Sequence, residues 1–347
     1  MGEIFMAIMV REIDMKKRWR KIAAVLGAVI FCLAAGILLW GREDDEAKAA
    51  AVLQEEEVPS TKQAVLDLER GNDAMVPVGN REKMTRLTIL RDGEAVFEIE
   101  KRPSENQEDF MEWYVTEPYK SPQLVNVSDL YEFLDHYASW DCIGSGNEEG
   151  FQESGIIVEE EFSDTGTVRI HLGKKEENTA QTILIEAGDS RKVYEVEEKT
   201  LQAMMGLNPE DFIMGIANLV YLTTVESLQI ETRKVSALIE IETDENNGQV
   251  YRAAGNELDG DDFRDLYAEI LSVLIEGSAE KREEGEEAVL SFVFQRNTAG
   301  LEDVTVRYFP YDQKHYLIEK NGTAEFLADR EQVDGLIEKL ERYCGKL

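Results

Sequence analysis

Histidine and cysteine are scarce in this chain, which has three of each among 347 residues. The histidines are His136, His171 and His315, and the cysteines are Cys32, Cys142 and Cys344. None falls in an H-E-x-x-H or C-x-x-C spacing, and no G-x-S-x-G nucleophile motif occurs. A zinc hydrolase, a dithiol oxidoreductase and a serine hydrolase are therefore disfavoured. We expect ordinary surface or partly buried histidines, no catalytic, cofactor-binding or metal-binding residue, and a protein that is not an enzyme.

The cysteines carry little structural information. Cys32 lies in an apolar segment, where we expect it to pack as a small side chain. Cys142 and Cys344 are far apart in the chain, and the sequence leaves open whether they form one disulfide or stay free. A single bond in so long a chain is no disulfide framework.

Positive charge is also in short supply. The chain has 37 lysine and arginine residues against 71 aspartate and glutamate residues, a formal net charge of −34. Such a surface repels nucleic-acid phosphates and anionic lipid headgroups, so we expect no nucleic acid among the partners. The simplest role of the acidity is solubility. Residues 1–40 are the exception, because their basic residues outnumber their acidic ones.

One long apolar run is present, Ile22 to Trp40, and it contains no charge and no proline. As a helix it would be about 28 Å long, close to the roughly 30 Å of a bilayer's hydrocarbon core. Five of the six positions 16–21 are lysine or arginine, and cationic segments stay on the cytoplasmic side. We therefore predict a cytoplasmic segment over 1–21, a single transmembrane helix over 22–40 in a bacterial plasma membrane, and an extracytoplasmic body.

Two alternatives concern the N-terminal region. A cleaved signal peptide would use a small-residue site such as Ala47-Lys48-Ala49, but the apolar run exceeds the roughly 7–15 residues of a signal-peptide core, so we expect the helix to be retained. Met15 opens a Met-Lys-Lys-Arg run typical of a bacterial membrane protein, and we expect residues 1–14 to be a start-site artefact. Residues 41–80 are predicted to form an acidic stalk with a short helix, which a capping box at Ser60 opens.

Beyond the stalk, apolar residues at every second position predict strands. Residues 84–207 form a first predicted repeat, with a hairpin over 84–99, a strand at Trp113, a helix from Asn126 and a loop over Gly144 to Gly150. Its last strands are predicted over 168–172, 183–185 and 193–196.

The same signature returns in residues 208–347. The hairpin pattern that begins at Met84 begins again at Val225, and Asp129-Leu130-Tyr131 returns as Asp265-Leu266-Tyr267. Two diverged copies of one unit explain this better than a single fold.

The predicted fold class is α+β. Each repeat is expected to be a mostly antiparallel sheet with packed helices, behind one N-terminal transmembrane helix. A linker helix is predicted over 209–221, with an apolar stripe that is expected to be core: Phe212, Ile213, Ile216, Leu219 and Val220. Further helices are predicted over 261–275 and 330–343.

Three loops resemble ligand sites in composition. Gly144 to Gly150 has the glycines of a phosphate-binding loop, but the third is displaced and two glutamates would repel a phosphate. Asp244 to Gly248 resembles a calcium loop, but its glycine comes one place early and Gly255 stands where a glutamate is required, so a hairpin turn is expected. The acids of Asp259 to Asp262 are expected to lie at a helix N-terminus.

The order of the packing motifs resembles that of one known family. In chain order the motifs are Leu87-x-Ile89, Trp113-x-Val115-x-x-Pro118, a helix with Leu130, Phe133 and Leu134, Leu172-Gly173 and Val193-Tyr194-x-Val196. They are similar to those of the bacterial domain-of-unknown-function family DUF 4340 (DUF4340), over about residues 84–347. The family's Gly-Leu-Asp-x-Pro element is reduced here to Gly155-Ile156, and Val250-Tyr251-Arg252 replaces the Trp-to-Pro strand in the second copy.

The resemblance implies a role beside a transporter. Members of the family are commonly encoded next to ABC-type permeases and an auxiliary protein. We therefore expect a membrane-anchored accessory or interaction protein of an ABC-type export system, with membrane lipid and a permease or auxiliary subunit as partners. The family brings no catalytic residues to transfer. The alternative is a stand-alone cell-envelope protein that binds a cation, a glycan or a peptide; an envelope hydrolase is disfavoured because no nucleophile or metal triad is recognisable.

Overall fold

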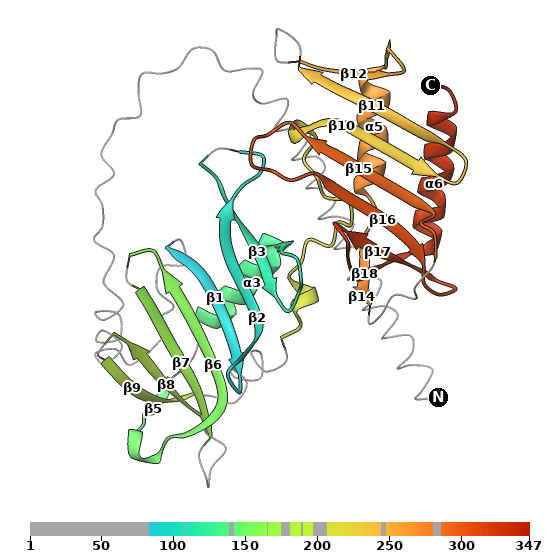
Figure 1. The fold of residues 1–347 in the computed structure, drawn as a ribbon. Helices are drawn as coiled ribbons and strands as arrows, with labels where there is room; N and C mark the ends of the chain where they lie inside the picture. The colour runs from blue at the N-terminus through green and yellow to red at the C-terminus, as the bar shows by residue number, and fades with distance from the viewer. Residues whose placement is uncertain are drawn as a thin grey trace, which may run out of the picture. The chain divides into compact units, whose positions relative to one another are not determined.

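The structure is a computed structural model that describes residues 83–347, except 108, 139–141, 165, 175–180, 189, 197–206, 244–247 and 280–285. The predicted transmembrane helix over 22–40, the segments before it and the acidic stalk lie outside these residues. Within the described part, no helix is both long and apolar enough to cross a membrane. The chain divides into two compact units between Gly215 and Ile216, an N-terminal unit and a C-terminal unit (Figure 1).

The N-terminal unit is built on one nine-stranded sheet. Its elements are β1 (Met84–Arg91), β2 (Glu94–Pro103), β3 (Met111–Glu117), β4 (Gln123–Leu124), α3 (Val127–Ala138), β5 (Cys142–Ser145), β6 (Gln152–Phe162), β7 (Gly166–Lys174), β8 (Gln181–Ala187) and β9 (Ser190–Val196). The strand order is β4-β3-β2-β1-β6-β7-β8-β9-β5. All neighbours in the sheet are antiparallel.

The C-terminal unit holds a second sheet of nine strands. Its elements are β10 (Val225–Thr232), β11 (Ser236–Thr243), β12 (Gln249–Ala253), β13 (Asn256–Glu257), α5 (Gly260–Leu271), β14 (Ile275–Ser278), β15 (Leu290–Arg296), β16 (Val304–Pro310), β17 (His315–Lys320), β18 (Thr323–Asp329) and α6 (Arg330–Cys344). The order is β13-β12-β11-β10-β15-β16-β17-β18-β14, so each strand matches the strand numbered nine lower in the first sheet. The helix before the edge strand, α3 or α5, has the same place in both.

These sheets correct the predicted fold class. The α+β prediction is wrong, because the described residues form a mainly antiparallel β structure with eighteen strands and three α-helices. The predicted helix over 261–275 ends at Leu271, and Ile275 begins the edge strand β14. The central strand β6 had no predicted counterpart. Its inward positions are apolar except for the buried Glu160. Because this residue stands between Glu159 and Glu161, the sequence shows three consecutive glutamates and no alternation of apolar and polar residues.

The predicted linker helix over 209–221 is also wrong. The segment makes one 3₁₀ turn, Pro209–Asp211, and then runs without helix through Gly215, whose φ is +71°. Phe212 belongs to the N-terminal core, with ring centroids 5.2 Å from Phe97 and 5.3 Å from Phe133. A helix would point its apolar stripe in one direction. This segment instead divides its apolar residues between two cores.

The second half of that segment enters the C-terminal unit. Ile216 forms an antiparallel bridge with Leu274, and the Ala217 amide donates to the Val273 carbonyl at 2.9 Å. Ile216 and Val220 are buried there, whereas Leu219 is half-buried. The expectation that the apolar residues of 209–221 are core is thus confirmed for most of them, although the segment that carries them is not a helix.

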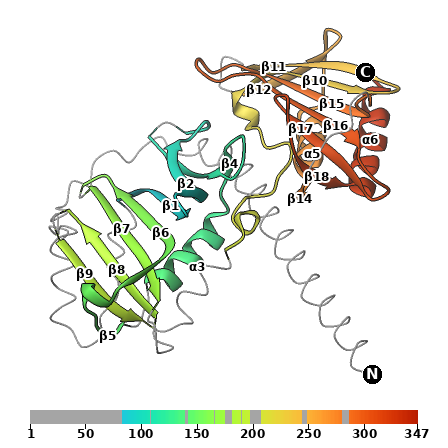
Figure 2. The same ribbon diagram turned by 60° about the horizontal axis from the view of Figure 1, so that its bottom comes forward.

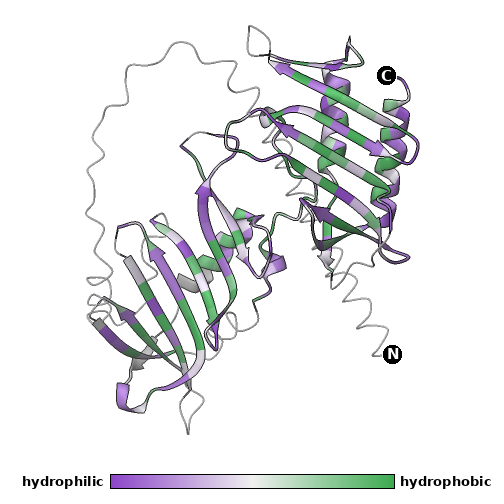
Figure 3. Ribbon diagram, viewed as in Figure 1, coloured by the Kyte–Doolittle hydropathy of each residue, from purple (hydrophilic) through white to green (hydrophobic). Residues whose placement is uncertain are grey.

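Each sheet has an inner face, covered by helices, and an outer face. Hydrophobic and hydrophilic residues alternate along the strands, as Figure 3 shows. Leu87, Ile99 and Val115 point inward and are fully buried, as is Leu130 of α3, which runs along that face (Figure 2). In the C-terminal unit the Tyr316 hydroxyl on β17 donates to Asp334 of α6 at 2.7 Å.

Two crossovers connect strands that are not neighbours in the first sheet. Helix α3 leads from edge strand β4 to edge strand β5 at the other side. Gly146 extends the pairing of β5 with β9 by donating to the Val193 carbonyl at 2.8 Å, and the connection back to β6 then passes over the outer face, where the Phe151 ring packs on Gly173. The predicted loop over Gly144 to Gly150 is therefore wrong at its start, since Gly144 pairs with Glu195 within the sheet.

Candidate functional site

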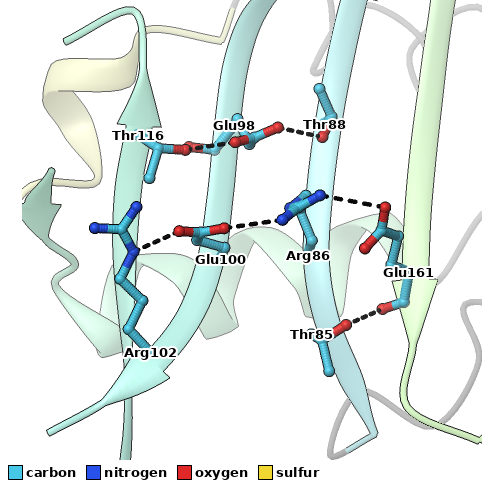
Figure 4. Close-up of polar contacts among 8 residues, drawn as sticks. All are labelled: Thr85, Arg86, Thr88, Glu98, Glu100, Arg102, Thr116 and Glu161. Atoms are coloured by element: carbon cyan, nitrogen blue, oxygen red, sulfur yellow. Dashed lines mark hydrogen bonds and ion pairs between the residues drawn. The ribbon is translucent and has the colours of Figure 1, made fainter. Parts of the chain in front are cut away.

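The most distinctive polar constellation lies on the outer face of the first sheet, across strands β6, β1 and β2. We call it the charged ladder and define it by these residues: Arg86, Glu98, Glu100, Arg102 and Glu161. Figure 4 shows their side chains lying in rows across neighbouring strands, with α3 behind the sheet. The alternation of β1 and β2 dictates this placement, because Leu87 and Ile99 occupy the opposite face.

Opposite charges alternate along the ladder. Arg86 on β1 donates a hydrogen bond from one guanidinium nitrogen to Glu100 at 3.1 Å and from the other to Glu161 at 3.3 Å. Arg102 pairs with the second oxygen of Glu100. Because Arg86 lies between two carboxylates and Glu100 between two guanidinium groups, the ladder ties three strands together at their side chains.

Glu98 has a different environment, between two threonines. Thr88 donates to one of its oxygens at 3.0 Å and Thr116 to the other at 2.8 Å. A carboxylate that accepts a hydrogen bond on each of its oxygens is held in a fixed orientation. This carboxylate therefore presents a positioned negative charge on the sheet face.

The ladder favours the charged forms of its members. Burial opposes ionisation of Glu100, but hydrogen bonds from Arg102 and Arg86 outweigh it and lower the pKa of this carboxyl. Burial likewise opposes the charge of Arg86, yet its hydrogen bond to Glu100 and the nearby charges of Glu161 and Glu98 raise its pKa. Groups held in this way are poor proton donors and acceptors near neutral pH. The arrangement suits recognition better than acid–base catalysis.

The histidines lie away from the ladder's centre. His171 on β7 has Nδ1 2.6 Å from Glu153 and Nε2 3.2 Å from Glu186. His315 on β17 has Nδ1 2.9 Å from Asp312, and its Nε2 is 3.8 Å from Glu276. His136 belongs to α3. No group of three or more histidine, cysteine, aspartate or glutamate residues arranged to hold a metal occurs in the described part of the chain.

The remaining predicted features fall at ordinary structural positions. Asp259 caps α5 and accepts from the amides of Asp261 and Asp262, as predicted for a helix N-terminus. Residues 244–247 lie outside the described part, between the antiparallel strands β11 and β12. Cys344 carries a free thiol, so the optional disulfide with Cys142 is not formed, and burial raises the pKa of this thiol.

One buried carboxylate was not singled out from the sequence. Glu160 on β6 is fully buried on the inner face, paired in register with Leu87 on β1 and Val168 on β7. Its side chain is closed off from solvent, so it is not an accessible reactive group. We treat it as a feature of the core.

The ladder also escaped prediction. Its local signal is visible, since Glu98, Glu100 and Arg102 occupy every second position of β2. The partners Arg86 and Glu161 come from strands whose register is not readable from the chain alone. Comparisons with models of known families, with curated proteins and with solved structures found no match. Membership of the DUF 4340 family therefore stays a prediction.

Proposed function

We propose that this chain is a non-enzymatic, single-pass membrane protein whose extracytoplasmic body binds a permease or auxiliary subunit of an ABC-type export system. The membrane anchor and the transporter rest on the sequence, through the apolar run over 22–40 and the resemblance described above. The structure contributes a surface suited to binding.

The observation that carries the binding role is the open charged ladder. The side chains of Arg86 and Arg102 remain 40% and 42% exposed although each is ion-paired. Helices pack on the inner face of this sheet, and no described helix packs on the ladder. A sheet face with fixed, alternating charges selects partners through a complementary charge pattern.

The first test is co-purification from detergent with an affinity tag on the full chain. We expect a permease or an auxiliary subunit to be enriched, as identified by mass spectrometry. Reversing two ladder charges, Arg86→Glu with Arg102→Glu, should remove the partner, because it replaces both cations in the pattern by anions.

A matched control lies on the outer face of the C-terminal unit. Arg252→Glu with Arg307→Glu changes the net charge equally, and these arginines also pair with carboxylates, Glu242 and Glu319. The control should retain the partner. Absence of any transporter component from the wild-type eluate would contradict the transporter role, and loss of the partner from the control alone would contradict the role of the ladder.

The second test concerns location. A protease added to protoplasts should digest the body and leave a short membrane-bound N-terminal fragment. Full protection of the body in intact protoplasts, with digestion only after lysis, would place it on the cytoplasmic side and exclude the proposal.

A further inference from the structure

A short segment crosses the outer face of the first sheet on its way from β5 to β6. We call residues 146–151 the strap; they include the 3₁₀ turn Glu148–Gly150. The strap begins on β9, where Gly146 donates to the Val193 carbonyl at 2.8 Å. It ends on β7, where the Phe151 ring lies so close to Gly173 that no larger residue fits there without a shift.

The surface beside the strap is buried although it faces away from the helices. Thr182 and Leu184 of β8 lie on the outer face, because they pair with Gly173 and His171 of β7. Their exposed fractions are only 6% and 4%. The Phe151 ring lies on Gly173, the register partner of Thr182, so the strap contributes to this cover.

The attachment of the strap to β7 is short. After the strap, Gln152 pairs with Lys174 and Glu153 pairs with Gly173, and the register then shifts before Ile157. Gly155, with a φ of +82°, lies within this irregular stretch. Two register pairs therefore hold the end of the strap, apart from the main ladder between β6 and β7.

One side-chain contact adds to these two pairs. The Glu153 carboxylate lies 2.6 Å from Nδ1 of His171 on β7, and the other ring nitrogen, Nε2, lies 3.2 Å from Glu186 on β8. The histidine side chain is only 15% exposed. Its ring thus joins the beginning of β6 to β7 and β8.

The other charged groups around this ring differ in how they are held. Glu186 also pairs with Arg191 of β9 at 2.9 Å, and Arg169, two residues before His171, pairs with Glu159 of β6 at 2.5 Å. The glutamates of the 3₁₀ turn in the strap are exposed. Within the described part of the chain, the Glu153 carboxylate has its hydrogen bond with His171 alone.

The protonation state of the ring decides how many of these contacts are hydrogen bonds. A neutral imidazole donates from one nitrogen and accepts at the other, whereas an imidazolium donates from both. Ionised carboxylates only accept. Both contacts of His171 are therefore hydrogen bonds only when the ring is protonated, and in the neutral ring one carboxylate faces a nitrogen lone pair.

We propose that His171 is a pH-dependent clamp for the strap. In mild acid the imidazolium binds Glu153 and Glu186 together and holds the strap on the sheet. As the pH rises through the range in which histidine loses its proton, near pH 6.5 in model peptides, one of the two hydrogen bonds is lost and the strap loosens. This inference goes beyond the proposed binding function and does not depend on it.

Hydrogen exchange of the full chain in phosphatidylcholine nanodiscs tests the clamp. We compare about pH 5.5 with about pH 8, where glutamate is ionised and histidine changes its charge. Rates are corrected for the intrinsic effect of pH, so that a change reports opening of the structure. We expect peptides that cover residues 146–153 to be about twofold to fivefold better protected at the lower pH, the size typical of a half-exposed ion pair. Equal protection at both values would overturn the proposal.

Two variants assign the effect to the clamp. His171→Gln removes the titrating ring, and Glu153→Gln replaces the carboxylate by an amide that can donate to a neutral ring. Each should abolish the pH dependence of the strap. Should His171→Gln lose protection in β1 and β2 as well, the N-terminal unit has been damaged, and Glu153→Gln then decides.

The matched control is His315→Gln, which removes a histidine of the C-terminal unit that also lies beside two acids, Asp312 and Glu276. It should leave the pH dependence of the strap unchanged. A pH dependence that persists in Glu153→Gln, or that disappears in His315→Gln, would overturn the clamp, because the effect would then not come from the contact between His171 and Glu153.

Discussion

The two units share one strand order but differ in what they place at matching positions. Arg86 and Glu161 form an ion pair between β1 and β6 of the N-terminal unit. At the same register positions between β10 and β15, the C-terminal unit has a neutral hydrogen bond from Ser227 to Gln295. Both units thus have a polar contact between these two strands at this outward position. It is an ion pair in the N-terminal unit and a neutral hydrogen bond in the C-terminal unit.

The inner faces differ more sharply. Leu87 and Leu228 are fully buried at equivalent places in β1 and β10. Leu87 pairs with Glu160, and Leu228 pairs with Phe294. One topology therefore tolerates a buried carboxylate in one copy and an aromatic ring in the other. Strand order and alternation specify the sheet, and the individual residues specify how stable each copy is.

The largest expected effect comes from giving the C-terminal unit the residue of the N-terminal one. Phe294 lies in an aromatic cluster, with ring centroids 5.9 Å from Phe292 and 6.2 Å from Tyr267. Phe294→Glu would bury a charge among these rings and should cost more than about 4 kcal/mol, enough to unfold this unit. Phe294→Leu should cost about 1–2 kcal/mol.

Hydrogen exchange of the full chain measures the outcome unit by unit. We expect amides of β15 and β16 to lose protection in Phe294→Glu, while amides of β1 and β2 keep theirs. Protection retained in the C-terminal unit would mean that the two inner faces are interchangeable, and would break the comparison.

The second prediction concerns a polar network of the C-terminal unit alone. Asn218 is fully buried; it donates to the Ile270 carbonyl at 2.8 Å and accepts from the Tyr308 hydroxyl at 2.7 Å. Burial raises the pKa of Tyr308, with the bond to Asn218 opposing it. The N-terminal unit has Leu172 at the place of Tyr308, so it lacks the donor.

Removing Asn218 should leave two buried groups without their partner. We expect Asn218→Leu to cost about 2–4 kcal/mol and Tyr308→Phe about 1 kcal/mol in urea unfolding. The double variant should lose less stability than the sum of the two single losses. Tyr308→Phe removes the hydroxyl that Asn218→Leu would leave buried without its hydrogen-bond partner. Strict additivity would show that the network does not act as a unit.

The same two inner faces explain how far the sequence predicts this fold. Strands whose apolar residues alternate, such as β1, β2 and β7, were predicted within a few residues and are confirmed. β6 was missed because Glu160 breaks its alternation. The linker was mistaken for a helix because Phe212 and Ile216 have helical spacing, although they serve different cores.

Sequence similarity also misled the alignment of the helices. Asp129-Leu130-Tyr131 matches Asp265-Leu266-Tyr267 in letters, but Tyr131 is 41% exposed and Tyr267 only 3%. Counting from the capping residues Asn126 and Asp259 matches Leu130 with Phe263 instead, and both are fully buried. The ladder was beyond reach for a related reason, since pairing between strands distant in the chain is set by register and not by local pattern.

The third prediction exchanges the outward pairs. Arg86→Ser with Glu161→Gln installs the neutral pair of the C-terminal unit in the N-terminal one. Exposed ion pairs contribute little, so we expect a loss below about 1 kcal/mol that shrinks further at high salt. Arg86→Ser alone should cost more than the double variant, because it leaves Glu100 and Glu161 without this cation. If the double variant were less stable than the single one, the neutral pair could not replace the ion pair. The ladder would then have a structural role in the N-terminal unit.

The smallest expected effect is an acid-dependent one, in the turn between β16 and β17. A hydrogen bond with the His315 ring, together with the Lys314 and His315 amides that donate at 2.7 Å, lowers the pKa of Asp312 from 3.8 to about 2. Because the folded-state pKa is the lower one, this carboxylate stabilises the unit above pH 3.8, and the contribution is lost as the pH falls toward 2. Asp312→Asn should therefore lower the thermal midpoint slightly near pH 5 and by clearly less near pH 2, where this carboxyl is already partly protonated in the folded state. Glu276→Gln, whose oxygen is 3.8 Å from the other ring nitrogen, is the control and should give a smaller shift at pH 5. An equal loss for Asp312→Asn at both pH values would mean that the turn depends on the shape of the side chain and not on its charge.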